Sequence, residues 1–407
     1  MSVRVVTVIA AVSLYPALLG TKLSANAGAE ARAASLYPTS KPARTSTPAA
    51  STTATTVLSL TLAGLSPIES EFDPNLSLRP SWDTGAIPSK DSVQGAFRFT
   101  CGAGQLLYDD PIVKPGAPGT SHLHQFYGNT SANAYSTFAS LRASGTSTCN
   151  YGQYAANRSA YWMPAMLDGK GNVVQPDYVP IYYKRRPATD PKCTLGNAQA
   201  QGNCVDLPNG LRFVFGWDPT GKNRAPTGAG FFDCTGPTAI PGHYLTITAV
   251  AAKCPPGQGN RVGFRIEAPD CWDGRRLDSP DHRSHVAYAR YGDWGYLKCP
   301  STHPYVIPAF TLAAWYSVNT GDDLTLWQFS SDAMAPGQPH GFTMHSDYFE
   351  AWDPTVKVMW HAGCINLLLN CSGGDLGDGK QLKGAAQPPY GWTNPVHLVP
   401  IPAMPGM

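Results

Sequence analysis

Charged residues are scarce in this sequence, and neither sign is in clear excess. Asp, Glu, Lys and Arg make up 14% of the 407 residues, against about 25% in an average soluble domain, and the formal net charge is +2. A nucleic-acid-binding chain needs a clustered basic face, for which this balance gives no electrostatic case. We therefore expect an ordinary extracellular surface and no nucleic-acid partner.

The short motifs that identify common enzyme sites are also missing. The chain has no Cys-x-x-Cys, no His-Glu-x-x-His, no Gly-x-Ser-x-Gly, and no phosphate-loop or dinucleotide fingerprint. A cupin-like site would want a Glu shortly after a His-x-His, but Gln125, Phe126 and Tyr127 follow the pair here. Function therefore has to be argued from other residues.

Long apolar runs are limited to the N-terminus. Met1–Arg4 gives a short positive start, Val5–Leu19 is mostly apolar, and Ala25-Asn26-Ala27 offers a small-x-small cleavage site. This order is typical of a secretory signal peptide, which we predict over residues 1–27. An uncleaved membrane anchor would need about 20 apolar residues. We expect a secreted, extracellular protein without membrane contact after cleavage.

Residues 28–66 have few large apolar side chains and are rich in Ala, Ser, Thr and Pro. Such a segment buries too little surface to offset its ordering entropy, which predicts a flexible linker. The remaining residues, 67–407, show no internal repeat and are expected to form a single β-rich domain. We expect this domain to be a monomer.

Ten cysteines in a secreted chain favour disulfides over zinc ligation. Sequence cannot establish their connectivity, but pairing each with its sequence neighbour would close mostly short loops, and this is our prediction. The cysteines are Cys101, Cys149, Cys193, Cys204, Cys234, Cys254, Cys271, Cys299, Cys364 and Cys371.

The body is predicted to be mainly β, as a β-sandwich or jelly-roll-like domain with long disulfide-pinned loops. No long stretch has 3.6-residue apolar spacing, whereas Phe264-Arg265-Ile266-Glu267 alternates as in a strand with one buried face. The predicted strands are short and bounded by Gly, Pro, Asn or Asp. They are Gly95–Thr100, Ser159–Met166, Asp177–Tyr183, Leu211–Trp217, Tyr244–Val250, Arg261–Ala268, His285–Arg290 and Val356–His361.

Two histidines one residue apart, His122 and His124, mark the candidate site. An extended backbone places residues i and i+2 on one face, so both imidazoles can reach the same point. Later segments carry further candidates, and we expect them to converge with the pair on one polar cleft. The candidate catalytic residues are His122, His124, His285, His303, His345 and Asp347.

Four motifs carry a resemblance to a known family. They are Ser121–Asn129, Pro269–Gly274, Leu277–His285 and Cys299–Pro304, supported by Tyr161–Met166. With these motifs the chain resembles a family of secreted bacterial and fungal proteins catalogued as a domain of unknown function. Fungal members are often joined to WSC modules, which are associated with carbohydrate and cell walls. The resemblance runs from about Phe97 to the late three-hundreds and implies no established reaction.

The first interpretation of the site is a divalent metal centre. His122 and His124 would be ligands, with His285, His303, His345 or Asp347 completing the set. Two imidazoles with a carboxylate are a familiar arrangement for zinc, iron or copper.

The second interpretation is metal-free acid–base chemistry on an extracellular or cell-wall polysaccharide, as a hydrolase or lyase. Asp347 and Glu350 are the obvious carboxylates, and arginines such as Arg283 could neutralise acidic sugar groups. The candidate substrate-binding residues are Gln125, Tyr127, Asp281, Arg283 and Trp272.

The third interpretation is non-catalytic. Tyr and Trp rings can stack on sugars while polar side chains bond hydroxyls, which would make a cell-wall binding module. Each histidine also has a purely structural alternative. His303 before Pro304 would brace a turn, and Trp272 would lie in the core.

Overall fold

The computed structural model describes residues 62–81, 87–88, 93–149, 155–194, 196–220, 228–292, 295–384 and 392–404. The predicted signal peptide and all but the end of the predicted linker lie outside these residues. Leu60–Met407 forms one compact unit. Within the described ranges, no helix is long and apolar enough to cross a membrane.

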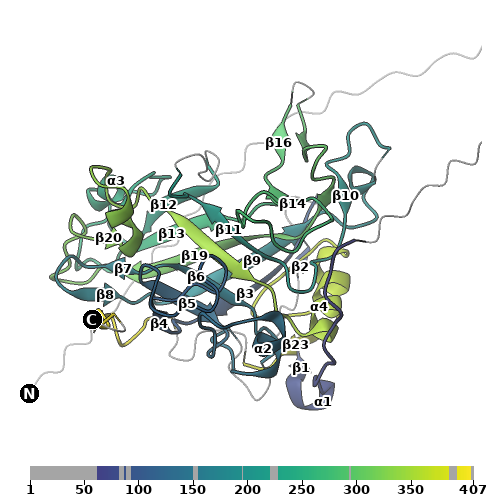
Figure 1. The fold of residues 1–407 in the computed structure, drawn as a ribbon, viewed down its shortest axis with the longest axis horizontal. Coiled ribbons are helices and arrows are strands. Elements are labelled where there is room, and N and C mark those ends of the chain that lie inside the picture. The colour runs from purple at the N-terminus through teal and green to yellow at the C-terminus, as the bar shows by residue number, and fades with distance from the viewer. Residues whose placement is uncertain are drawn as a thin grey trace, which may run out of the picture. The chain divides into compact units, whose positions relative to one another are not determined.

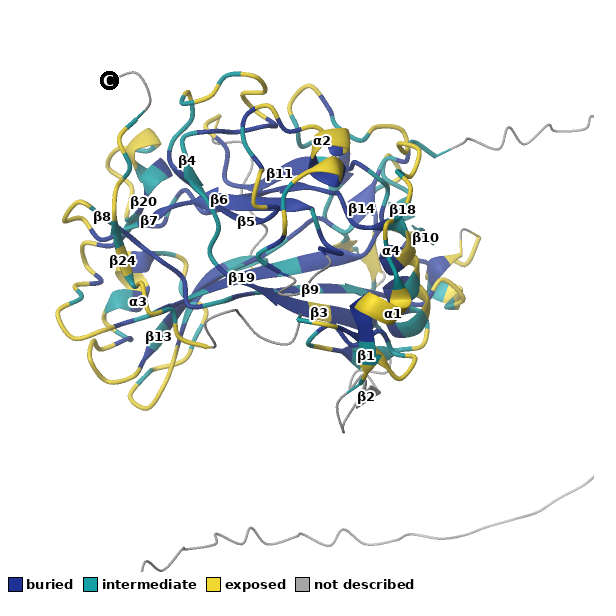
Figure 2. Cartoon of the chain, turned by 90° about the horizontal axis from the view of Figure 1, so that it is seen from below, coloured by how far each residue is buried: buried dark blue, intermediate teal, exposed yellow. Residues whose placement is uncertain are grey.

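Two sheets make up the body, and they appear as separate layers in Figure 2. The smaller sheet is antiparallel throughout. In spatial order its strands are β11 (Arg212–Gly216), β21 (His345–Phe349), β6 (Ala160–Pro164), β5 (His124–Gly128) and β4 (Leu106–Leu107). The larger sheet has the order β12 (Gly230–Thr235), β13 (Arg261–Glu267), β19 (Ala309–Ser317), β9 (Val179–Arg185), β3 (Gly95–Cys101), β22 (Leu369–Cys371) and β2 (Ile87–Pro88).

Short elements extend the two ends of the layers (Figure 1). The helices are α1 (Pro74–Ser77), α2 (Phe138–Ala143), α3 (Ile247–Ala251) and α4 (Pro354–Trp360), with single turns at Pro191–Cys193, Ser330–Met334 and His361–Ile365. The small sheets pair β1 (Leu78–Pro80) with β23 (Lys380–Leu382), and β16 (Arg290–Tyr291) with β17 (Leu297–Lys298). Two more have the orders β10 (Asn203–Cys204), β18 (Tyr305–Val306), β14 (Cys271–Trp272), β15 (Val286–Ala287), and β20 (Gln328–Phe329), β7 (Met166–Leu167), β8 (Asn172–Val174), β24 (Leu398–Pro400).

Aromatic side chains from both sheets meet between the layers. Phe310 of β19 contacts Tyr161 of β6 and Tyr348 of β21, with ring centroids 5.7 and 4.9 Å apart. The hydroxyl oxygens of Tyr161 and Tyr183 lie 2.7 Å apart, and Tyr183 donates to the hydroxyl of Tyr348 at 3.0 Å. Because these polar atoms bond one another, the rings can be fully buried without an orphaned hydroxyl. The predicted mainly β, sandwich-type fold is confirmed.

The jelly-roll part of that prediction is not confirmed. β22 runs parallel to β3, so the larger sheet is mixed, whereas a jelly roll is an antiparallel architecture. Because successive side chains of a strand point to opposite faces, the core-facing residues determine which side chains of the smaller sheet point outward. Tyr127, Tyr161 and Tyr348 point into the core, so their strand neighbours point to the opposite face.

Two predicted strands are wrong. Tyr244–Val250 contains most of α3, and Val356–His361 lies mostly in α4. Side-chain caps explain both: the Thr246 hydroxyl accepts from Ala249 N, and Asp353 accepts from Thr355 N and Val356 N. Each segment is apolar enough to resemble a strand, but its preceding cap starts a helix instead.

All ten cysteines are paired, each with its sequence neighbour. The pairs are Cys101–Cys149, Cys193–Cys204, Cys234–Cys254, Cys271–Cys299 and Cys364–Cys371. The predicted pairing of sequence neighbours is therefore confirmed.

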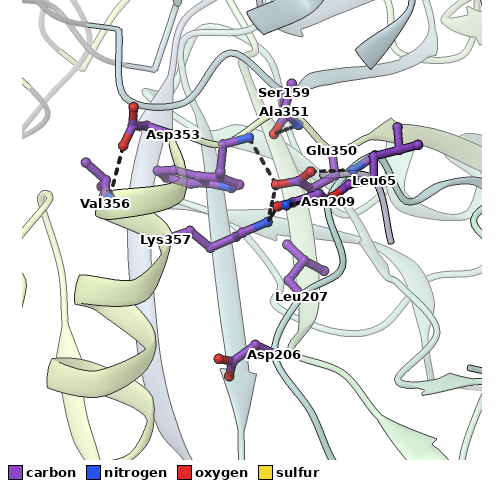
Figure 3. Close-up of polar contacts among 12 residues, drawn as sticks. Leu65, Ser159, Asp206, Leu207, Asn209, Glu350, Ala351, Asp353, Val356 and Lys357 are labelled. Carbon is purple, nitrogen blue, oxygen red and sulfur yellow. Dashed lines mark hydrogen bonds and ion pairs between the residues drawn. The ribbon is translucent and has the colours of Figure 1, made fainter. Parts of the chain in front are cut away.

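A buried ion pair joins α4 to the end of β21 (Figure 3). Lys357 Nζ lies 2.8 Å from Glu350 Oε1 and also donates to the Asn209 side chain. Glu350 accepts two further bonds, from Gly210 N at 2.7 Å and Trp352 N at 3.1 Å. With all these bonds satisfied, Glu350 is a structural carboxylate, and its candidacy as an acid–base group is wrong.

Replacing Lys357 with Met removes the cation and leaves the Glu350 carboxylate buried without its charge partner. We expect the free energy of unfolding to fall by about 3–5 kcal/mol, measured by urea denaturation at pH 7. The exposed Lys380→Met is the matched control and should change stability by less than about 0.5 kcal/mol. Equal effects of the two substitutions would contradict this account.

Candidate metal centre

Three histidines meet on the outer face of the smaller sheet. His124 begins β5 and His345 begins β21, with β6 between them. His124 is level with Pro164 of β6, while Asp347 is level with Trp162, two residues earlier. His124, Pro164 and His345 therefore share one row across three strands. Pro164 has no long side chain to fill the space between the two imidazoles.

The three rings are close enough to share one ion. Ring centroids lie 4.1 Å apart for His122 and His124, 5.2 Å for His122 and His345, and 6.3 Å for His124 and His345. One nitrogen from each ring lies within 4.8 Å of the others. Zn–N bonds are about 2.0–2.1 Å long, so nitrogens at this spacing can converge on a single ion.

Backbone carbonyls fix the orientation of two of these rings. His124 Nδ1 lies 2.9 Å from Asp109 O, and His345 Nδ1 lies 2.7 Å from Thr343 O. A carbonyl only accepts, so each Nδ1 carries the proton and each Nε2 presents a lone pair. The Nε2 atoms of His122 and His124 are buried and have no hydrogen-bond partner among the described residues. Buried polar atoms without partners are rare, so these two lone pairs are available to coordinate a ligand.

Burial favours the neutral form of the three imidazoles, which is the form that binds a metal ion. Loss of hydration and the nearby His345 lower the pKa of His124 to about 3. Burial and neighbouring imidazoles also hold the pKa of His122 and of His345 well below the ordinary value. Neutral imidazoles are the form that binds metals. The three-nitrogen set is compatible with zinc or another first-row divalent ion, with a coordination position left for water or substrate.

The cluster opens into a cavity of about 170 Å³. Its walls include Asp347 from β21, Arg283 from the loop before β15, and Trp217, with Asp110 and Lys114 from the loop before β5. Neither carboxylate oxygen of Asp347 has a hydrogen-bond partner among the described residues. Burial, and then the neighbouring Asp110, hold the pKa of Asp347 well above its ordinary value. Asp347 is therefore a carboxyl at the cavity wall whose ionisation is disfavoured by its surroundings.

The sequence profile described as "Domain of unknown function (DUF1996)" matches residues 110–352, more than half of the chain. The chain belongs to the DUF1996 family. The expected membership of a family of unknown function is thus confirmed, while the link to WSC modules stays an expectation. No curated protein and no solved structure matches the chain. The matched part of the DUF1996 chain contains all three clustered histidines, Asp110, Arg283 and Asp347.

The predicted convergence is correct for His122, His124, His345 and Asp347, but it is wrong for two histidines. Both ring nitrogens of His285 are occupied, by Ser279 Oγ at 2.8 Å and Arg212 O at 2.9 Å. His303 likewise contacts Thr302 Oγ1 at 2.8 Å and Ser284 O at 2.9 Å. Neither residue lines the cavity. Both histidines hold neighbouring loops and lie outside the cluster of His122, His124 and His345.

Three predicted substrate contacts are also wrong. Gln125 is buried and donates to Gly104 O at 3.0 Å, and Tyr127 lies in the core between the sheets. Both follow from strand alternation, because these residues point away from the face that carries His124. Trp272 is buried, and its indole N–H donates to Arg276 O at 2.6 Å.

Of the remaining two predicted contacts, Arg283 lines the cavity and Asp281 holds the loop that carries it. Arg283 donates to Gly216 O at 3.1 Å and to Trp217 O at 2.9 Å, which aligns its guanidinium beside the cavity. Asp281 does not line the cavity, but its carboxylate accepts from Ser279 Oγ at 2.7 Å and Ser284 N at 2.9 Å. It therefore holds the loop that presents Arg283.

Sequence reasoning missed Asp109, Asp110 and Trp217. Asp109 anchors His124 through its carbonyl, and its carboxylate accepts from Gly119 N at 2.9 Å and Ala134 N at 3.0 Å. The one signal in the sequence was the acidic pair Asp109-Asp110, which precedes His122 on the same connection. A hydrogen bond from an imidazole to a backbone carbonyl cannot be recognised from the sequence.

We expect purified, reconstituted protein to bind one divalent ion per chain, measured with Zn²⁺ by elemental analysis and competition titration. His124→Ala and His345→Ala each remove a ligand and should lower the affinity by more than about 100-fold. His303→Ala is the control and should keep full stoichiometry, since this imidazole braces a loop. Unchanged zinc binding in both cluster variants would rule out the centre.

The metal-free protein should lose stability in mild acid. The folded pKa of His124 is about 3, below the unfolded value of about 6.5, so the unfolded state binds more protons between these pH values. The stabilising contribution is complete above pH 6.5 and is lost as the pH falls toward 3. His124→Gln should make the decline between pH 6.5 and 4 shallower by up to about 1.4 kcal/mol per pH unit, measured by urea unfolding.

The contribution of Asp347 to the free energy of unfolding changes with pH in the opposite direction. Its raised pKa means that the folded state keeps a proton which the unfolded state releases above about pH 3.8. Its contribution to stability therefore falls as the pH rises. Because both proteins of the comparison contain Asp347, this term cancels, and an identical pH slope for His124→Gln and the parent would refute a neutral buried His124.

Proposed function

We propose that this DUF1996 protein is a secreted metal-dependent hydrolase that acts on extracellular or cell-wall polysaccharide. The observation that carries the proposal is the cluster of His122, His124 and His345 at a cavity, with two unpaired ring nitrogens. A divalent ion bound there would supply a Lewis acid and an activated water. Five disulfides support an extracellular setting.

Asp347 is the group best suited to move a proton. Its carboxyl shares the cavity with His345, and neither oxygen has a hydrogen-bond partner in the part of the chain that the structure describes. Once a cation occupies the centre, its charge favours the ionised form of a nearby carboxyl, opposing the effect of burial. Asp347 would then accept a proton from the attacking water and deliver it to the leaving oxygen. This assignment retains the predicted catalytic role of Asp347 and favours hydrolysis over elimination.

The size and walls of the cavity restrict what can enter. A volume of about 170 Å³ is below the roughly 300–1,000 Å³ of sites that enclose drug-sized ligands. A single sugar residue or a substituent such as an acyl group matches this size, so we expect one unit of the polysaccharide to enter while the rest of the chain stays outside. Arg283 and Lys114 can donate hydrogen bonds to its oxygens, and Trp217 offers an apolar wall.

The test is a screen of cell-wall polysaccharides, natively acetylated and chemically deacetylated, for reducing ends and for free acetate. We expect one of these products with the metal-loaded protein and none after chelation. Asp347→Asn should lower the turnover rate by about 10²–10⁴-fold while zinc stoichiometry stays intact, because the three imidazoles remain. Asp378→Asn changes an exposed carboxylate outside the cavity and serves as the control.

Retention on the glycan without either product would instead indicate a binding module. Full activity after chelation would contradict the metal-dependent mechanism.

A further inference from the structure

The larger sheet has an outer face of its own, on the side of the sandwich opposite the histidines. Its core-facing residues include Phe97, Tyr183, Phe264 and Phe310. Strand alternation sends their neighbours outward, and Figure 2 shows intermediate exposure interrupting the buried stretches along β13 and β19. The outward positions of β3, β9, β13 and β19 carry four cationic side chains and one acidic one. They are Arg98, Lys184, Arg261 and Arg265, with Glu267. Lys184 Nζ lies 2.9 Å from Glu267 Oε1, and Arg261 Nε lies 3.0 Å from Asp177 Oδ2, so these two cations are neutralised by ion pairs.

Two of these cations lie over aromatic rings. The guanidinium carbon of Arg98 is 5.4 Å from the ring centroid of Tyr182, its cross-strand neighbour on β9. Arg265 lies 5.0 Å from the ring of Phe231 on β12. Neither arginine forms an ion pair within the described ranges. A ring beneath a guanidinium limits its rotamers while leaving its N–H groups free, which preorganises it for a planar anion such as a carboxylate.

The face continues at both ends. Toward one end, Tyr178 packs against Trp315 and Trp392, with centroids 6.5 and 5.1 Å away, and Trp392 is 49% exposed. Toward the other end, Lys184 and Glu267 line a separate cavity of about 520 Å³, together with Arg186, Gln201, Tyr288 and Tyr291. Exposed rings thus lie toward both ends of the face, Trp392 at one end and Tyr291, which is 72% exposed, at the other.

We propose that this outer face binds an acidic polysaccharide, a chain that carries carboxylates, and holds it on the side of the protein away from the metal centre. Arg98 and Arg265 would each bond a carboxylate, and the exposed rings would pack against the apolar faces of the sugars. Charge complementarity favours this occupant over a neutral glycan, since Arg98 and Arg265 point outward and form no ion pair among the described residues. The surface is independent of the proposed hydrolytic reaction and would function without it.

The experiment measures retention of the full-length protein by polygalacturonate, in affinity electrophoresis and by titration calorimetry, with dextran as the neutral glycan. Binding should weaken steeply as NaCl rises from about 0.05 to about 0.5 M, because exposed charges are screened. Arg98→Glu/Arg265→Glu should weaken binding by about tenfold or more. The milder Arg98→Gln/Arg265→Gln should show a smaller loss and covers the case in which the charge reversal perturbs folding.

The matched control, Arg275→Glu/Lys380→Glu, makes the same change in net charge at exposed positions outside this face and should bind like the parent. His124→Ala should also bind normally, and the Arg98/Arg265 variants should keep full zinc stoichiometry, so the two proposals fail separately. The inference is overturned if the face variants bind like the control variant, or if dextran is retained as strongly. Equally tight binding of duplex DNA at matched charge concentration would also overturn it, by showing an unselective cationic surface.

Discussion

The packing of tyrosine and phenylalanine rings between the two sheets is the constraint on which the rest of the structure depends. Tyr161, Tyr183 and Tyr348 bond one another through their hydroxyls, so a shift of one strand by one residue would break those bonds and expose the rings. Register is therefore fixed from the inside. The outward faces then follow from the pleat alone, with imidazoles on one sheet and arginines on the other.

Placing three imidazoles together on a buried face is costly in the absence of a ligand. Each burial removes hydration from a group that would otherwise gain a proton near pH 6.5, and two Nε2 atoms have no partner among the residues described. The sheet supplies the rigidity that holds this arrangement, because His124 and His345 sit on strands and only His122 comes from a loop. Their carbonyl contacts with Asp109 and Thr343 set the ring orientations before any ligand arrives.

Much of this arrangement was accessible from the sequence, and the errors have physical causes. The shared face of His122 and His124, and of His345 and Asp347, needs only the two-residue period of a strand. The same two-residue period places Gln125 and Tyr127 on the face of the strand opposite His124. Applied consistently, it would have excluded both from the predicted substrate contacts. Distinguishing His345 from His285 was out of reach, because which distant strand pairs with β6 is decided by the whole core.

Helix α4 illustrates a second kind of error. Val356–His361 is apolar and β-branched enough to resemble a strand, but Asp353-Pro354 in front of it is a good helix start. The Asp-Pro helix start was visible in the sequence, but the apolar, β-branched composition of the segment led to the prediction of a strand. The carbonyl of Asp109 is different, since no side-chain pattern reports where a backbone oxygen points.

The disulfide-closed loops contain only some of the residues of the candidate metal centre. The loop closed by Cys101–Cys149 carries Asp110, His122 and His124, and the loop closed by Cys271–Cys299 carries Arg283, while β21 lies in neither. Reduction would therefore free the connections that carry His122 and Arg283, while His124 and His345 stayed packed on β5 and β21. The two covalent links thus restrict the motion of the loop residues around the histidine cluster, whereas the strand residues depend on sheet pairing alone.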